Sequence, residues 1–196
     1  MVAKRGVVWL RCINDIKEKL KSVLSEERFD HSLRVADQSV ILARRFGADA
    51  RKAETAGVLH DCARDLSFGE ALNEANNFGI ILDNVTKNSP GIIHAVIGEA
   101  LARFEYNIND HDILDAIRYH TTGRKGMSML EKIVFIADYT EPSRDFQGAA
   151  GARDILEQSL DRAVLYAMEN TIAYLLEKRM LIHLDTIDAR NHYLAH

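Results

Sequence analysis

The spacing of apolar residues is the feature that most restricts how this chain can fold. From about residue 14 onward, apolar side chains recur mostly at intervals of three and four residues, which places them on one face of a helix. Only two prolines, Pro90 and Pro142, interrupt the 196 residues. No convincing set of segments alternates polar and apolar residues as strands do. The sequence therefore predicts an all-α fold.

Capping residues indicate where the helices begin and end. Asp49 is a typical N-cap, Ser89 precedes a proline at the first helical position, and Ser128 opens a capping box. With Gly47 as a C-terminal cap, we expect helices over residues 14–46 with a break near 25–30, 49–64, 89–104, 111–120, 128–141 and 154–179, the last as one helix or two. Residues 66–88 are expected to form a short helix with loops. Residues 180–184 should be extended, and a short helix should follow from 186.

Composition and charge exclude several classes of protein. We find no repeat, low-complexity tract or linker, so we expect one domain over residues 1–196. Two cysteines, Cys12 and Cys62, are too few for a disulfide framework and favour a reducing compartment. No run approaches the ~20 apolar residues of a membrane span, and a net charge of −4 argues against general nucleic-acid binding. We expect a soluble, cytoplasmic protein that binds neither nucleic acid nor membrane.

Six side chains that can bind metal lie on or beside apolar helix faces: His31, His60, Asp61, His94, His120 and Asp138. A buried polar group without a partner costs about 1–3 kcal/mol, and one shared cation would satisfy several at once. Imidazole nitrogen with carboxylate oxygen suits zinc, iron, nickel or manganese better than calcium. A single histidine on such a face is more often a hydrogen-bonded core residue. The set as a whole therefore carries the metal-site interpretation.

The same residues, in the same order, resemble the HD superfamily of metal-dependent phosphohydrolases. A longer match resembles the YqeK family within it, which comprises proposed bacterial symmetrical diadenosine tetraphosphate hydrolases. It covers about residues 29–191, and its most specific part is the run HTTGR from His120 to Arg124, followed by Met127-Ser128, Leu130-Glu131-Lys132, Ala137-Asp138-Tyr139, Glu141-Pro142 and Arg144. The segment Ala56-Gly57-Val58-Leu59-His60-Asp61 also matches.

The resemblance implies an HD-domain helical bundle that holds an iron-type divalent cation. Its ligands would be His31, His60, Asp61 and Asp138, while His94 and His120 would face the substrate phosphates or hold a second metal. Thr121 and Arg144 are expected to contact the substrate. The nucleoside end is expected near Leu181, Ile182, His183, Leu184, Asp185 and Thr186.

The reaction that the resemblance implies is hydrolysis of a nucleotide phosphoanhydride. A divalent cation lowers the pKa of a bound water and neutralises phosphate charge. Asp61 would orient that water or accept its proton, and His94 and His120 would donate hydrogen bonds to the developing charge. Arg124 and Lys125 are further candidates for phosphate contacts. The leading hypothesis is symmetrical cleavage of diadenosine tetraphosphate into two ADP.

Other interpretations stay open. The substrate could be a nucleoside di- or triphosphate or a cyclic nucleotide, or the chain could be a nucleotide-binding regulatory module or a helical interaction protein. The amphipathic stretch at residues 160–176 is either core or the face of a homodimer, which we favour. Residues 26–28 are interpreted as a solvated helix face, and Cys62 as a buried structural thiol. Several relatives carry histidine where Glu27 stands, and residues 1–13, with Trp9, are either an N-terminal extension or a misassigned start.

Overall fold

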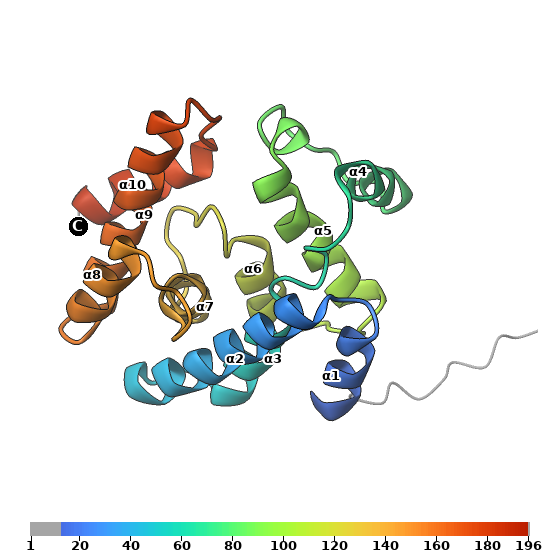
Figure 1. Ribbon diagram of the computed structural model, residues 1–196, viewed down its shortest axis with the longest axis horizontal. Coiled ribbons are helices and arrows are strands. Elements are labelled where there is room, and N and C mark those ends of the chain that lie inside the picture. The colour runs from blue at the N-terminus through green and yellow to red at the C-terminus, as the bar shows by residue number, and fades with distance from the viewer. Residues whose placement is uncertain (1–12, 196) are drawn as a thin grey trace, which may run out of the picture.

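The chain is built entirely from helices in the part that the structure describes. The computed structural model describes residues 13–195, so the proposed N-terminal extension with Trp9 lies outside the described residues, apart from Ile13. Within that range no strand occurs, which confirms the all-α prediction (Figure 1). The elements are α1 (Ile13–Lys21), α2 (Glu26–Phe46), α3 (Ala50–Leu59), α4 (Phe68–Asn77), the 3-10 helix η1 (Thr86–Asn88), α5 (Pro90–Phe104), α6 (His111–Arg118), α7 (Met129–Thr140), α8 (Gln147–Leu156), α9 (Leu160–Glu177) and α10 (Leu184–Ala195).

Two of the expected helices end earlier than predicted, and each is followed within two residues by a histidine. The helix expected to reach residue 64 stops at Leu59, and the Nδ1 of His60 lies 2.8 Å from the carbonyl of Gly57. In the same way α6 stops at Arg118, and the Nδ1 of His120 lies 2.7 Å from the carbonyl of Ile117. Each imidazole satisfies a carbonyl that a helix end leaves open. Both side chains are therefore fixed in turns that follow the helices.

Other elements agree with the prediction only in part. Region 66–88 contains one short α-helix with loops, as expected: α4, which opens with a capping box between Ser67 and Glu70. The long C-terminal stretch is two helices, and α8 begins at Gln147 rather than near residue 154. The last helix begins at Leu184 rather than near residue 186. By contrast, Asp49, Pro90 and the capping box at Ser128 open helices as expected.

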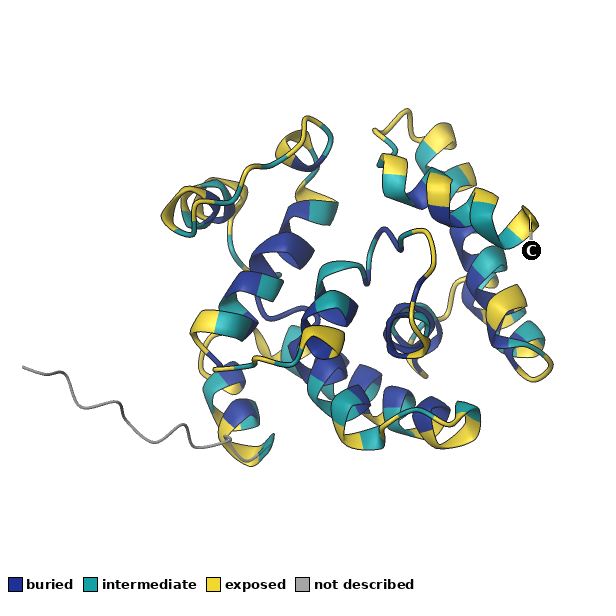
Figure 2. Ribbon diagram, turned by 180° about the vertical axis from the view of Figure 1, so that it is seen from behind, coloured by how far each residue is buried: buried dark blue, intermediate teal, exposed yellow. Residues whose placement is uncertain are grey.

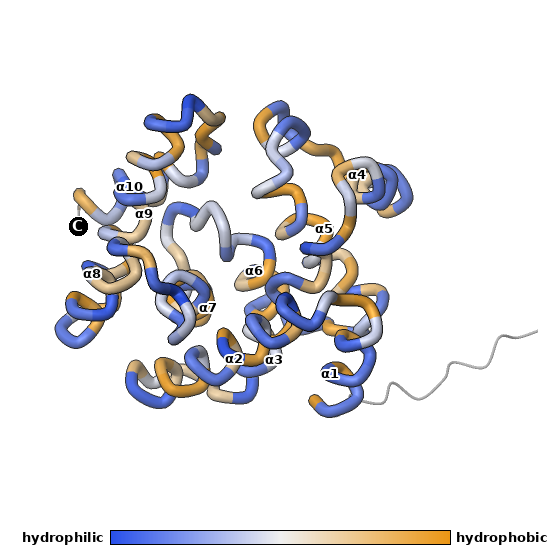
Figure 3. Tube along the Cα trace, viewed as in Figure 1, coloured by the Kyte–Doolittle hydropathy of each residue, from blue (hydrophilic) through white to orange (hydrophobic). Residues whose placement is uncertain are grey.

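The core lies where α7 is enclosed by its neighbours. Helices α2, α3 and α6 pack on one side of α7 and α9 packs on another, while α8 and α10 cover α9 (Figure 1). Ile133, Ile136 and Ala137 of α7 are fully buried, and Figure 2 shows this helix buried over most of its surface. Figure 3 shows long hydrophobic stretches in α5 and α7, whereas α1 and α4 are largely hydrophilic.

The pair α2 and α3 approaches unusually closely because one contact residue is a glycine. A Cβ at Gly57 would lie 2.7 Å from the Cα of Ala36 and 3.2 Å from the Oγ of Ser39. Only a residue without a side chain fits there. This approach brings the helix that carries His31 next to the helix end that carries His60.

None of the described helices combines the length and apolar character that a membrane crossing requires.

Candidate functional site

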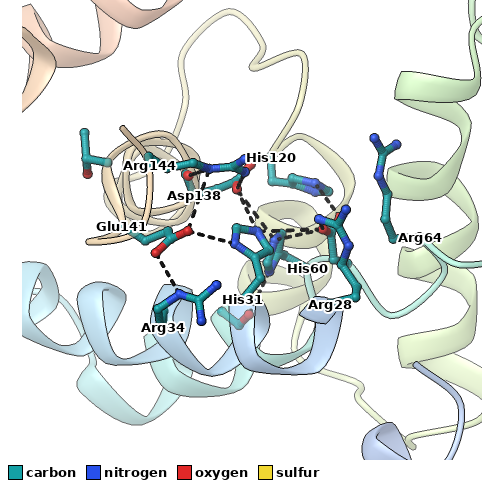
Figure 4. A network of polar contacts seen from close by, with 12 residues as sticks. Arg28, His31, Arg34, His60, Arg64, His120, Asp138, Glu141 and Arg144 are labelled. Atoms are coloured by element: carbon teal, nitrogen blue, oxygen red, sulfur yellow. Dashed lines mark hydrogen bonds and ion pairs between the residues drawn. The ribbon is translucent and has the colours of Figure 1, made fainter. Parts of the chain in front are cut away.

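The four residues predicted to bind metal converge from different helices. His31 comes from α2, His60 follows α3, and Asp138 comes from α7 (Figure 4). Asp61 directly follows His60 in the sequence. The Nε2 of His31 lies 3.0 Å from Asp138 Oδ1 and 3.8 Å from Asp61 Oδ2. The Nε2 of His60 lies 3.5 Å from Asp61 Oδ2 and 3.9 Å from Asp138 Oδ1. Two sets of donor atoms lie close enough to share an ion: His31, His60 and Asp138 form one, and His60, Asp61 and His120 form the other.

Two of these donor atoms are buried without a hydrogen bond to any described group. They are the Nε2 atoms of His31 and His60. The Nδ1 of His60 is used on Gly57, and the Nδ1 of His31 lies 3.2 Å from the Oε1 of the buried Glu141. A histidine held by a carboxylate or carbonyl through one nitrogen typically offers the other to a metal. The cluster fits a divalent cation, and its nitrogen and oxygen donors suit a transition metal.

The protonation states of the cluster are those that a cation requires. Burial lowers the pKa of His60 to about 4, so this imidazole is neutral at pH 7. Burial alone would raise the pKa of Asp61, but His60, His120 and His94 hold it well below its usual value. Burial opposes ionisation of Asp138 as well, yet its close contacts with His31 and with the Arg144 guanidinium hold its pKa well below the usual value. Both carboxylates are ionised.

Two more histidines extend the cluster beyond Asp61. The Nε2 of His94 on α5 lies 3.1 Å from Asp61 Oδ1, and the Nε2 of His120 lies 3.6 Å from the same oxygen. The two Nε2 atoms are 3.2 Å apart. Arg64 donates to the Nδ1 of His94 at 3.0 Å, so the proton of neutral His94 is on Nε2. Burial would lower the pKa of His120, but the hydrogen bond and charge of Asp61 raise it.

Sequence reasoning missed three cationic side chains of the site, Arg28, Arg34 and Arg64. Arg28 Nη1 donates to Asp61 Oδ2 at 2.8 Å, so the interpretation of residues 26–28 as a wholly solvated face is wrong for this residue. Glu26 and Glu27 are exposed as expected. Arg28 precedes His31 by three residues, which puts both on one face of α2. That spacing was the available signal.

Two of the predicted arginines have different surroundings. Arg144 donates from Nη2 to Asp138 Oδ1 at 2.6 Å and from Nε to the Asp138 carbonyl at 3.0 Å, so it lies within the cluster. Arg124 is instead paired with Glu131 at 2.6 Å and Asp115 at 3.0 Å, and it joins α6 to α7. Arg124 is therefore a structural clamp, and Lys125 is exposed.

A cavity of about 350 Å³ lies between the start of α5 and the end of α9, and we call it the α9 pocket. Of the residues predicted to bind the substrate, Thr121, Leu181, His183 and Thr186 line it. A neighbouring cavity of about 250 Å³ is lined by Asp185 and also by His183. His183 Nε2 lies 3.2 Å from Asp83 Oδ2. Ile182 and Leu184 line neither cavity.

Cys62 follows the site in sequence but points away from it. Its thiol is buried and lies 3.5 Å from the Gly98 carbonyl. Burial raises the pKa of this thiol to about 12. These observations agree with a structural role for Cys62.

Comparison with known proteins places this geometry in a family. The family model described as the HD domain matches residues 28–143. A Bacillus subtilis protein called symmetrical bis(5'-nucleosyl)-tetraphosphatase is 38% identical over 85% of this chain and 89% of its own length. A Staphylococcus aureus protein of the same name is 37% identical over 92% and 94%. A crystal structure from Clostridium acetobutylicum, described as a predicted HD superfamily hydrolase involved in NAD metabolism, superposes with a TM-score of 0.91, 38% identity and 94% and 98% coverage. The chain belongs to the HD-domain family and, within it, to the same family as these symmetrical bis(5'-nucleosyl)-tetraphosphatases.

Proposed function

We propose that this protein is a metal-dependent hydrolase that cleaves a nucleotide phosphoanhydride, and that its substrate is diadenosine tetraphosphate, split symmetrically into two ADP. The observation that carries the proposal is the pair of buried, unpartnered Nε2 atoms of His31 and His60 beside two ionised carboxylates. The names of relatives that match most of the chain supply the substrate class.

The cation is held by His31, His60, Asp61 and Asp138, and we propose that it is iron. When bound, a divalent cation supplies positive charge that neutralises phosphate oxygens and makes a water more acidic. Glu141 fixes the orientation of His31 through its Nδ1, and Gly57 fixes that of His60. The ligands are thus held in place before a cation arrives, which reduces the cost of ordering them on binding.

The remaining polar groups act on the water and the phosphates. Asp61 orients the attacking water and accepts its proton, and Arg28 holds this carboxylate at 2.8 Å. His94, with its proton on Nε2, donates a hydrogen bond to a phosphate oxygen, and His120, whose pKa is raised by Asp61, does the same when it is protonated. Hydrogen bonds from a preorganised, buried site to the developing charge are among the largest contributions to catalysis. Water attacks one phosphorus, the central P–O bond breaks, and two ADP leave.

The nucleoside end is proposed to bind along Leu181, Ile182, His183, Leu184, Asp185 and Thr186, with Thr121 beside it. Arg144 holds a phosphate, since a guanidinium offers a fork of donors that matches phosphate oxygens. We also propose that residues 1–196 act as one domain and that the protein is a homodimer that binds no nucleic acid.

Incubating the metal-loaded protein with diadenosine tetraphosphate tests the proposal directly. ADP as the sole product supports symmetrical cleavage, whereas ATP with AMP would refute it. Tight binding without any product would favour a regulatory module. Asp61→Asn should abolish turnover, while the matched control Asp112→Asn, at an exposed carboxylate paired with Lys52, should not. Metal content after purification, and activity after reloading with iron, manganese or zinc, tests the identity of the cation.

A further inference from the structure

The polar cluster is a row rather than a compact group, and Asp61 lies in its middle. Oδ2 of Asp61 faces His31 and Arg28, whereas Oδ1 faces His94 and His120. Figure 4 shows Arg34, Glu141 and Arg144 toward one end and His120 and Arg64 toward the other. The α9 pocket, lined by Thr121 and Thr122 directly after His120, adjoins the second end. The first end of the row, which carries Arg34, Glu141 and Arg144, is therefore not adjoined by the α9 pocket.

A separate cavity of about 240 Å³ adjoins that first end, and we call it the α2 pocket. Its lining includes Arg28, His31, Arg34, Arg144 and Phe146. It shares no lining residue with the α9 pocket. Because His31 belongs both to this lining and to the polar cluster, the α2 pocket opens onto the row. A long ligand could therefore occupy both pockets and cross the row.

Three arginines line the α2 pocket together with three carboxylates, those of Glu27, Glu141 and Asp145, and the arginines supply donors that suit phosphate. Each contacts a carboxylate of the row or beside it: Arg28 with Asp61 at 2.8 Å, Arg34 with Glu141 at 3.0 Å and Arg144 with Asp138 at 2.6 Å. The side chains are 28%, 36% and 35% exposed, and a guanidinium has five N–H donors. These contacts orient the arginines and use only some of their donors. The others are free for phosphate oxygens.

Phe146 gives the same pocket a surface on which a base can stack. Phe146 lies directly before α8, and the residue is 43% exposed. Its ring packs edge-on against Tyr139, with the ring centroids 5.1 Å apart and the ring planes at 89°. On another side it is backed by Gly148, where a Cβ would lie 3.2 Å from the ring. The ring is thus fixed from behind and open in front. A fixed, exposed aromatic ring beside arginine side chains is a combination that recognises nucleotides without sequence readout.

We propose that the α2 pocket binds the second nucleoside of a dinucleoside polyphosphate, with its phosphates on the three arginines and its base against Phe146. This inference rests on the proposed function and deepens it. The first nucleoside occupies the α9 pocket, and the polyphosphate crosses the row of histidines and carboxylates. With one nucleoside bound at each end, the central anhydride lies beside Asp61. This arrangement accounts for cleavage into two equal halves.

The test compares two substrates that carry the same four phosphates. Diadenosine tetraphosphate has a nucleoside at both ends, and adenosine 5'-tetraphosphate has one. Phe146→Ala should raise KM for the first about tenfold, because loss of base stacking removes affinity of this order. The same change should alter the affinity for adenosine 5'-tetraphosphate, measured as substrate or as competitive inhibitor, less than twofold. Phe146→Trp should restore or lower KM for diadenosine tetraphosphate.

Phe104→Ala is the matched control, since Phe104 is 59% exposed and stacks on Phe78 rather than lining the α2 pocket. It should leave both affinities unchanged. If Phe146→Ala proves unstable by thermal unfolding, Phe146→Leu keeps apolar packing on Tyr139 while removing the flat ring. Equal losses for both substrates, or no loss for either, would overturn the α2-pocket assignment. Failure of the wild-type protein to release ADP would instead overturn the proposed function, so the two failures are distinguishable.

Discussion

Replacing Gly57 by alanine should push α2 away from α3 and destabilise the protein. The new Cβ would lie 2.7 Å from the Cα and 3.0 Å from the backbone nitrogen of Ala36. Because both are backbone atoms, no side chain can rotate to make room, and the helices must move apart by several tenths of an ångström. Overpacking of this kind costs about 1–3 kcal/mol, and rigid neighbours favour the upper end. Alanine in a helix returns about 1 kcal/mol relative to glycine. We expect a net loss near 2 kcal/mol.

Urea unfolding of the metal-free protein measures this loss. Gly69→Ala is the control, because Gly69 also lies within a helix but a Cβ there meets nothing within 4 Å. It should stabilise by up to about 1 kcal/mol. The two identical substitutions should therefore have opposite signs. Separation of α2 from α3 should also weaken metal binding, since His31 and His60 lie on opposite sides of this contact. If Gly57→Ala left stability equal to or above the wild type, the steric reasoning would be refuted.

Three further outcomes follow from the site. Glu141→Gln should weaken metal binding about 10- to 100-fold, as loss of a group that orients a histidine ligand does; titration calorimetry measures it, and an unchanged Kd would contradict the role of Glu141. Metal-free protein should lose stability as pH falls from 6.5 toward 4, because His60 has a folded pKa of about 4 and protonates more readily in the unfolded chain. By linkage this protonation lowers the free energy of unfolding by about 2–3 kcal/mol at pH 4.5. Urea unfolding at each pH measures the loss, which should be absent in His60→Asn. Cys62 should resist thiol reagents in the native state, since burial raises its pKa to about 12, and labelling at the rate of a free thiol would refute this.

The helical fold could be predicted because helix starts and helix faces depend on residues that are close together in the sequence. Asp49, Pro90 and the capping box at Ser128 act within a few residues of the helices that they open. Helix α4 was harder to predict, since its buried positions are the small residues Ala71 and Ala75, which form a weak apolar stripe. The early ends of α3 and α6 depend on side chains that turn back on their own helices, and periodicity does not register such contacts.

The six members of the cluster could be listed from the sequence, but their mutual pairing could not. The Arg28–Asp61 and His31–Glu141 contacts join residues 33 and 110 positions apart. No local rule sets such pairs, because they depend on how α2 docks against α3 and α7. The arrangement of the cluster as a row with a cavity at each end likewise arises only from tertiary packing. Local sequence patterns thus indicate which side chains can bind metal or take part in catalysis, whereas tertiary packing determines which groups they contact.

The α9 pocket lies between the start of α5 and the C-terminal helices α9 and α10. One wall comes from the start of α5, and the other comes from the end of α9 and the beginning of α10. None of the six cluster residues lies on α8, α9 or α10. With the nucleoside in the α9 pocket, as we propose, changes in those helices would alter which base is accepted while the proposed hydrolytic groups stay as they are. In evolution or in engineering, ligand preference can drift in this C-terminal layer independently of the reaction itself.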